Sequence, residues 1–249
     1  MPYDLQGVYA KLDRADYHLE QLRSELRADP GGNYHFTTDS DRKTNEHIIV
    51  YRMPKDISLR YGIIAGEVIS QIRSALDHTV WAMVPVANRD RCSFPVFDNK
   101  RGYIKYGLPK IHGINSSAST IIEGLQPFNC GGPSAPVYIL NKLWNRDKHQ
   151  ILNFVGGAVD AYKRIYFLKD GTTREIVADV PRRRLEDGAE VIRVKHPDFY
   201  RPQMRVVTHM TLCLKFWDDD IAPDKEVTEL LANLIEFGKG VVEVLAATS

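Results

Sequence analysis

Hydrophobic residues recur at steps of three and four along four stretches of the chain, a spacing that predicts amphipathic helices. The predicted helices cover residues of about 3–28, 56–85, 116–155 and 224–246. Glycine or proline follows the first and third stretches, as is typical of helix ends. In the last stretch the apolar positions fall on one side, which predicts a helix that closes a helical core.

Two other regions have the alternating pattern of β-strands. Residues 33–53 carry β-forming side chains on both sides of a polar stretch, which predicts a hairpin. Residues 160–216 contain further extended segments, and Lys169-Asp170-Gly171-Thr172 has the composition of a hairpin turn. We therefore predict an α+β fold, with a helical core, an N-terminal β-hairpin and a C-terminal antiparallel four-stranded meander. Because no linker or repeat interrupts this pattern, residues 1–249 are predicted to form a single domain.

The most distinctive pattern lies in the second predicted helix, between Gly66 and Trp81. At about 100° per residue its apolar side chains fall within an arc of roughly 120°, which predicts a buried face. The opposite side carries Glu67, Ser70, Gln71, Ser74 and His78. Arg73 and Asp77 lie at one border, four residues apart, where their side chains can pair. A face that only contacts water more often carries Lys and Glu, so this combination of side chains predicts a functional site.

A second polar signal lies in the helix predicted over residues 135–155. Asp147 falls inside its apolar stripe, and an unpaired buried carboxylate is unfavourable, so this residue is expected to have a partner. Asp147 either orients Arg73 or His78 from the neighbouring helix, or caps a new segment that begins at Lys148. His149 lies on a flanking side of the same helix.

The segment Arg73-Ser74-Ala75-Leu76-Asp77-His78 resembles the Arg-x(4–6)-His motif of HEPN domains. Its longer context is similar to a group of uncharacterised bacterial proteins, which carry an acidic residue before such a helix and an Asp-Lys-His segment after it. The corresponding elements here are Glu67, the Arg73–His78 stretch and Asp147-Lys148-His149, with Phe94-Pro95 and Leu125-Gln126-Pro127 between them. Two features depart from the HEPN pattern: the small Ser74 follows the arginine, and HEPN domains are helical bundles without the predicted strands.

The resemblance implies a metal-independent endoribonuclease that acts as a homodimer, with two Arg/His motifs meeting at the interface. Arg73 would then stabilise charge on the scissile phosphate, and His78 would act as general acid or base. Glu67 or Asp77 would tune the pKa of His78 or fix its tautomer. Because Arg73 and His78 lie about 140° apart on an ideal helix, a kink or a dimer axis is needed to aim both at one point. Other HEPN domains have lost activity and serve as binding modules.

Composition changes this picture little. The formal net charge of +1 gives no global basic field, so an RNA partner has to meet a local patch, such as one around Arg182-Arg183-Arg184. Suitable metal-ligand types occur at His78, Asp77, His149 and Asp147. No HxxxH or HExxH spacing supports such a site, so we expect neither a metal nor a cofactor. Three widely spaced cysteines, no signal peptide and no apolar run of about 20 residues predict a cytoplasmic protein without a membrane segment.

Two hypotheses of different classes follow. The first is a HEPN-like, metal-independent endoribonuclease that cleaves RNA and dimerises through the helix at 58–84. The second is a non-catalytic protein that uses the same cleft to bind a small ligand or a cognate protein partner. The candidate residues of both are Arg73 and His78, supported by Glu67, Ser74, Asp77, Asp147 and His149.

Overall fold

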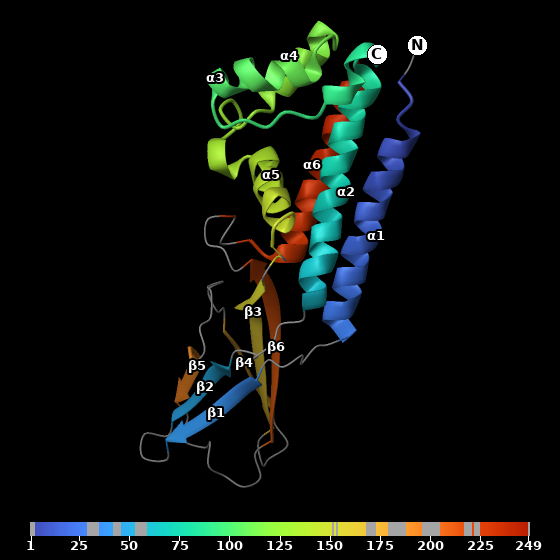
Figure 1. Ribbon diagram of the computed structural model, residues 1–249. Helices are drawn as coiled ribbons and strands as arrows, with labels where there is room; N and C mark the ends of the chain where they lie inside the picture. The colour runs from blue at the N-terminus through green and yellow to red at the C-terminus, as the bar shows by residue number, and fades with distance from the viewer. Residues whose placement is uncertain are drawn as a thin grey trace.

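Helices and strands occupy opposite ends of the molecule, as Figure 1 shows. The computed structural model describes residues 3–28, 35–41, 46–52, 59–150, 152, 154–167, 173–178, 188–195, 205–216, 221 and 225–248. Helices account for most of these residues. Within the described part of the chain, no helix combines the length and the apolar composition that crossing a membrane requires.

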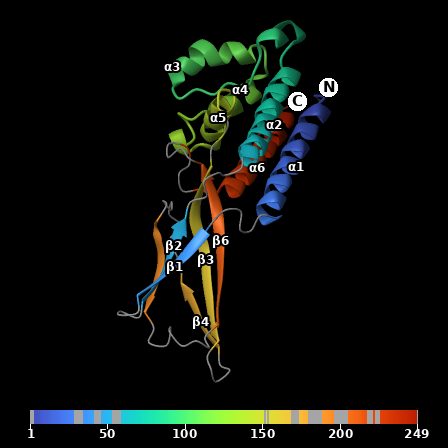
Figure 2. The same cartoon turned by 60° about the horizontal axis from the view of Figure 1, so that its bottom comes forward.

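Three long helices build the centre of the helical part: α1 (Gln6–Ala28), α2 (Leu59–Met83) and α6 (Val227–Ala246). They lie side by side and contact one another (Figures 1 and 2). α1 and α2 run antiparallel, because Glu25 near the end of α1 accepts two hydrogen bonds, of 2.7 and 2.8 Å, from Arg60 at the start of α2. The apolar positions that predicted these helices are buried in the core, among them Leu12, Leu19, Ile72, Leu231 and Leu234.

The third predicted helix is divided into two. α4 (Ser116–Gly124) begins after Asn115, whose side-chain oxygen accepts a hydrogen bond from the backbone N–H of Ala118, as an N-cap does. α5 (Pro136–Asp147) begins with a proline at its first position and packs against α2. The prediction of helix up to residue 155 is wrong: α5 ends at Asp147, and the residues from Phe154 onward pair with another strand instead.

Shorter helical turns connect α2 with α5. They are two 3₁₀ helices (Val86–Arg91 and Leu108–Ile111), the single turn α3 (Lys100–Gly102), a π-helical turn (Tyr103–Gly107) and a 3₁₀ turn (Gly132–Ser134). Residues 92–97, between the Val86–Arg91 turn and α3, are extended and run along α2. This path brings the backbone at Phe94 to the side of α2 that carries Arg73.

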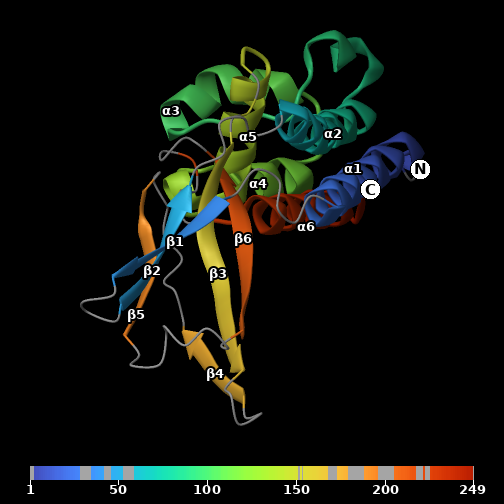
Figure 3. The same cartoon turned by 90° about the horizontal axis from the view of Figure 1, so that it is seen from below.

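Six strands in the described residues form two three-stranded antiparallel sheets. One sheet has the order β1 (His35–Asp41), β2 (Glu46–Arg52) and β5 (Glu190–Lys195). The other has the order β4 (Thr173–Ala178), β3 (Phe154–Phe167) and β6 (Arg205–Phe216). Figures 2 and 3 show β3 and β6 as long neighbours that extend away from the helices.

The predicted fold class is wrong in its sheet, because the described C-terminal strands do not form a four-stranded meander. β5 leaves the C-terminal strands and pairs with β2, far away in the sequence. An ion pair accompanies this pairing, because Arg193 of β5 donates to Glu46 of β2 over 2.7 Å. Backbone hydrogen bonds of 2.9 Å also join the buried Tyr51 to Gly188 and Ala189, just before β5. The corrected description is a mostly helical chain with its strands divided between two small sheets.

Candidate functional site

α2 is buried along one side and open along another. The predicted buried arc is confirmed, because every member of it is buried: Val68, Ile69, Ile72, Leu76, Thr79, Val80 and Met83. On the predicted polar side, Glu67, Ser70 and His78 are exposed, and Gln71 and Ser74 are half-buried. Arg73 differs from these residues, because it is only 4% exposed.

Three neighbours hold the guanidinium of Arg73 inside the protein. Its Nη2 donates to Asp77 Oδ1 over 2.9 Å and to the backbone carbonyl of Phe94. Its Cζ lies 4.9 Å from the centre of the Trp144 ring, within the range of a cation–π contact. Burial lowers the pKa of Arg73 and the Asp77 carboxylate raises it, and the group stays charged because arginine is so basic. The predicted pairing of Arg73 with Asp77 is therefore confirmed, as an interaction in the interior.

The residues that follow α2 are fixed against it by side chains. Asp77 Oδ1 accepts a second hydrogen bond, of 2.8 Å, from the backbone N–H of Phe94, so one oxygen holds both Arg73 and the extended segment 92–97. Gln126 is fully buried, and its Nε2 donates to the carbonyl of Pro95 over 2.9 Å. Elements of the resemblance that lie far apart in sequence, Phe94-Pro95 and Leu125-Gln126-Pro127, therefore meet beside α2.

Two lysines join Arg73 on this side of α2. Lys148 follows α5, and its Nζ lies 3.0 Å from the centre of the same Trp144 ring. Lys110 Nζ donates to Ser93 Oγ over 3.0 Å. Burial lowers the pKa of Lys148, and repulsion from Arg73 and Lys110 lowers it further. We call Arg73, Lys110 and Lys148 the cation cluster.

The cation cluster carries more positive charge than its neighbours neutralise. The carboxylate that opposes the repulsion at Lys148 is that of Asp77. This carboxylate is already engaged, because Oδ1 accepts hydrogen bonds from Arg73 and from the N–H of Phe94. Three cations beside one engaged carboxylate produce a local positive potential, which attracts anions.

Asp147 contacts neither Arg73 nor His78. Its carboxylate lies against Gly66 of α2 and leaves no room there for a Cβ atom. Among the described residues this side chain has no hydrogen bond or ion pair, and burial raises its pKa. Neither predicted role is therefore found: Asp147 orients neither motif residue, and Lys148 is the C-cap of α5 rather than the start of a capped segment.

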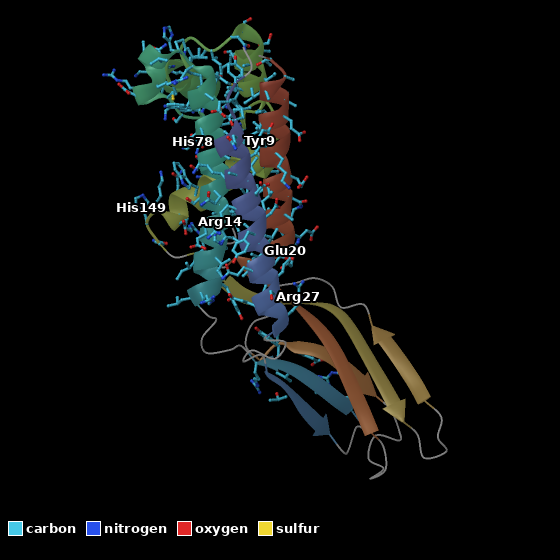
Figure 4. All side chains as sticks on the ribbon, turned by 90° about the vertical axis from the view of Figure 1, so that its right-hand side faces the viewer. Tyr9, Arg14, Glu20, Arg27, His78 and His149 are labelled. Atoms are coloured by element: carbon cyan, nitrogen blue, oxygen red, sulfur yellow. The ribbon has the colours of Figure 1, made fainter. Side chains whose placement is uncertain are left out.

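His78 lies on the open side of α2, next to α1 (Figure 4). Burial lowers the pKa of His78, the positive charge of Lys11 on α1 lowers it further, and Asp77 opposes both effects. The imidazole is therefore neutral at pH 7. The side chain of Arg73 contacts Phe94 and Trp144 instead. Within one copy of the chain, Arg73 and His78 therefore lie on different sides of α2.

The remaining predicted site residues do not gather around the motif. Glu67 Oε2 lies 3.1 Å from Nδ1 of the buried His18 of α1. His149 is exposed beyond α5, and Figure 4 shows it well apart from His78. Ser74 is half-buried beside Arg73. His78, Asp77, His149 and Asp147 do not come together either: no group of three or more His, Cys, Asp or Glu side chains that could hold an ion is found among the described residues.

Arg182-Arg183-Arg184, the predicted phosphate-contacting patch, lies outside the described residues. The described residues do bring positive charge together in the cation cluster, which the sequence pattern indicates only weakly. Lys148 stands in the quoted Asp-Lys-His segment, whereas Trp144 has the pattern of an ordinary core residue. Lys110 carries no signal, because its position depends on how the turns after α2 fold back.

Comparison of this chain with family models, with curated proteins and with solved structures finds no match. Its function therefore has to be inferred from the site itself.

Proposed function

We propose that the chain binds an anionic ligand of the phosphate class at the cation cluster, without catalysing a reaction on it. The observation that supports this proposal is the convergence of Arg73, Lys110 and Lys148 beside a single engaged carboxylate, that of Asp77. Lys148 is exposed and Lys110 is half-buried, so neither lysine is enclosed in the interior as Arg73 is. Arg73 is buried, so it contributes charge from behind the Trp144 ring rather than a hydrogen bond.

The chemistry of these donors favours a phosphate group. Lys110 and Lys148 each present three N–H donors, and the Ser93 hydroxyl lies 3.0 Å from the Lys110 ammonium. A phosphate has several acceptor oxygens and takes charge-assisted hydrogen bonds from all of these groups. Binding would also relieve the repulsion between the cations, so the pKa of Lys148 should rise when the ligand binds.

Isothermal titration calorimetry with inorganic pyrophosphate tests this function. Lys148→Met removes the charge at similar volume, and we expect it to raise the Kd about tenfold or more, since a charge-assisted hydrogen bond contributes roughly 1.5–3 kcal/mol. Lys142→Met is the matched control on α5, the helix that Lys148 caps, because Lys142 is exposed and its Nζ lies 5.2 Å from the Tyr138 ring instead. Absence of binding, or equal binding by all three proteins, would reject the proposal.

The second candidate is the metal-independent RNA cleavage that the HEPN resemblance implies. The observation that favours it is the exposed imidazole of His78, whose lowered pKa keeps it in the neutral form that a general base needs at pH 7. In this mechanism the guanidinium of Arg73 would have to move out of the interior to reach the phosphate, because the residue is only 4% exposed.

A homodimer through α2 belongs to this second candidate. Three large apolar residues are exposed at the two ends of the open side: Leu59 (63%), Ile63 (50%) and Trp81 (49%). Small residues, Ser70 and Ser74, lie between them. An antiparallel second copy crossing near Ser70 would bring Leu59 of one copy beside Trp81 of the other, in a two-fold symmetric contact. Light scattering should then report a dimer that Ser70→Arg converts to a monomer.

Labelled single-stranded RNA incubated with pure protein in EDTA tests the second candidate. We expect cleavage to be lost in His78→Ala and kept in His112→Ala, which removes another exposed histidine. RNA that remains intact with the wild-type protein would reject the enzyme, and would leave the anion-binding proposal to be decided by calorimetry alone.

A further inference from the structure

The helical turns around α3 lie at the end of the helical part that faces away from the sheets (Figure 1). Residues of these turns line an open groove. Its volume is about 650 Å³, and it is lined by Ala87, Asn88, Asp90, Arg91, Ile104, Leu108, Pro109 and His112. The two walls are joined, because Asn88 Nδ2 donates to the backbone carbonyl of His112 over 2.9 Å. The groove is therefore formed in advance of any partner.

Apolar side chains are unusually exposed in and around this groove. Val86 is 75% exposed, Tyr106 55%, Ile104 53% and Leu108 36%. A soluble surface rarely gathers several large apolar residues around one hollow unless a partner covers them. This end of the molecule therefore has the character of an interaction surface.

The same segment concentrates positive charge. Residues 86–112 contain six Lys and Arg residues and two Asp residues, a net charge of +4, whereas the whole chain carries +1. Arg91 lines the groove, and Lys105 is exposed beside Ile104. Two of these six cations have partners elsewhere, because Lys100 pairs with Glu123 over 3.3 Å and Lys110 donates to Ser93. The other four Lys and Arg residues still outnumber the two Asp residues, so an acidic partner complements this segment.

We infer that the groove docks a segment of another protein in which aliphatic residues alternate with aspartate or glutamate. Aliphatic side chains of the partner occupy the hollow between Ile104 and Leu108, and its carboxylates face Arg91 and Lys105. This inference does not depend on the proposed anion site, because the Lys110 side chain turns away from the groove, toward Ser93.

The lining separates this partner from other anionic surfaces. Ala87, Ile104, Leu108 and Pro109 are aliphatic, and His112 is the one aromatic residue in this lining, whereas single-stranded nucleic acids stack successive bases on several aromatic side chains. A lipid bilayer accepts apolar residues that protrude into it, and here Ile104 and Leu108 line a hollow that also contains Asp90. A protein segment fits both the concave shape and the charge.

Selection from a displayed library of random 12-residue peptides tests this inference on the full chain. The wild type should enrich peptides that combine acidic and aliphatic residues. Ile104→Ser should lose this enrichment, and Arg91→Glu should shift it away from acidic sequences. Val244→Ser is the matched control, because Val244 is an exposed apolar residue of α6 (52%) outside the groove. Thermal unfolding of each variant verifies that its fold is intact.

Fluorescence anisotropy of the most enriched peptide then gives the magnitude. We expect the Kd to rise about tenfold or more in Ile104→Ser, as is usual for a central apolar contact, and to stay unchanged in Val244→Ser. No enrichment, enrichment that survives Ile104→Ser, or a preference for basic peptides would overturn the inference. Binding to phosphatidylglycerol vesicles with the same dependence on Ile104 and Arg91 would overturn it in favour of a membrane surface.

Discussion

On one side of α2, Arg73 is 4% exposed, donates hydrogen bonds to Asp77 and Phe94, and makes a cation–π contact with the Trp144 ring. On the other side, His78 is exposed and feels the charge of Lys11 on α1. Asp77 influences both residues: it pairs with Arg73 and raises the pKa of His78. The comparison shows that an arginine and a histidine five residues apart can share an electrostatic neighbour without sharing a pocket.

The side of α2 that carries Arg73 gathers cations, whereas the side that carries His78 gathers few charges. Lys148 and Lys110 approach Arg73 from elements that follow it by dozens of residues, whereas the open side carries small or isolated polar groups such as Ser70. The groups that could bind an anionic ligand therefore lie on the Arg73 side of α2, which the sequence pattern shows only as the border of the apolar face. The predictions below perturb one side at a time, beginning with the largest expected effect.

Asp77→Ala should have the largest effect on stability. It leaves the buried guanidinium of Arg73 without its counter-charge and the N–H of Phe94 without its acceptor, so we expect the free energy of unfolding to fall by about 3 kcal/mol. Urea denaturation measures this loss. His78→Ala, one residue away on the open side, should change stability by less than about 0.5 kcal/mol. Similar losses in both variants would remove the distinction between the two sides.

Gly66→Ala tests the close contact between α2 and α5. The new Cβ would overlap the Asp147 carboxylate and force it to move, so we expect a loss of about 1 kcal/mol. In an Asp147→Ala background the same change should stabilise the protein by about 0.5–1 kcal/mol, because alanine favours a helix interior over glycine. Thermal melts of the four proteins decide the matter, and a loss that persists without Asp147 would show that another neighbour blocks the position.

Asp147→Asn should stabilise the protein modestly at neutral pH. Burial raises the pKa of Asp147, so its charged form is disfavoured in the folded state, and wild-type stability falls as pH rises through that raised pKa. The variant avoids this loss, and we expect a gain of about 0.5 kcal/mol at pH 7. The gain should vanish near pH 3, where the carboxyl is protonated in both states. A gain that is equal at both pH values would contradict the assignment to charge burial.

His78→Gln should have the smallest effect, confined to mildly acidic solution. The pKa of His78 is lowered in the folded state, so the unfolded chain takes up the proton first and stability falls as pH drops through about 6.5. The variant should lose less stability between pH 7 and pH 5, by a few tenths of a kcal/mol. Urea midpoints at the two pH values measure this difference, and a larger loss in the variant would reverse the sign.

The local periodicity predicted the parts of the molecule that local physics determines. The apolar faces of α1, α2 and α6 and the Arg73–Asp77 pair depend on neighbours three or four residues away, and all are found. The pairing of β5 with β2 depends on contacts such as Arg193–Glu46, 147 residues apart, so the nearest-neighbour meander was wrong.

The candidate site illustrates the same limit. The sequence indicates that Asp147 needs a neighbour, and the structure supplies Gly66, a residue without a side chain that no charge-pairing argument selects. Lys110 reaches the site because the turns after α2 fold back on it, and no periodic pattern describes those turns. Elements of the resemblance do converge beside α2, although Arg73 and His78 serve different sides of it.

The most direct test of the cation cluster is the protonation of Lys148 itself. Nuclear magnetic resonance of the lysine side chains, titrated with and without pyrophosphate, reports the pKa of each ammonium group. The free protein should show the pKa of Lys148 below its ordinary value, and pyrophosphate should raise it while leaving Lys142 unchanged. A pKa of Lys148 that is ordinary in the free protein, or that pyrophosphate does not move, would contradict an anion site at the cation cluster.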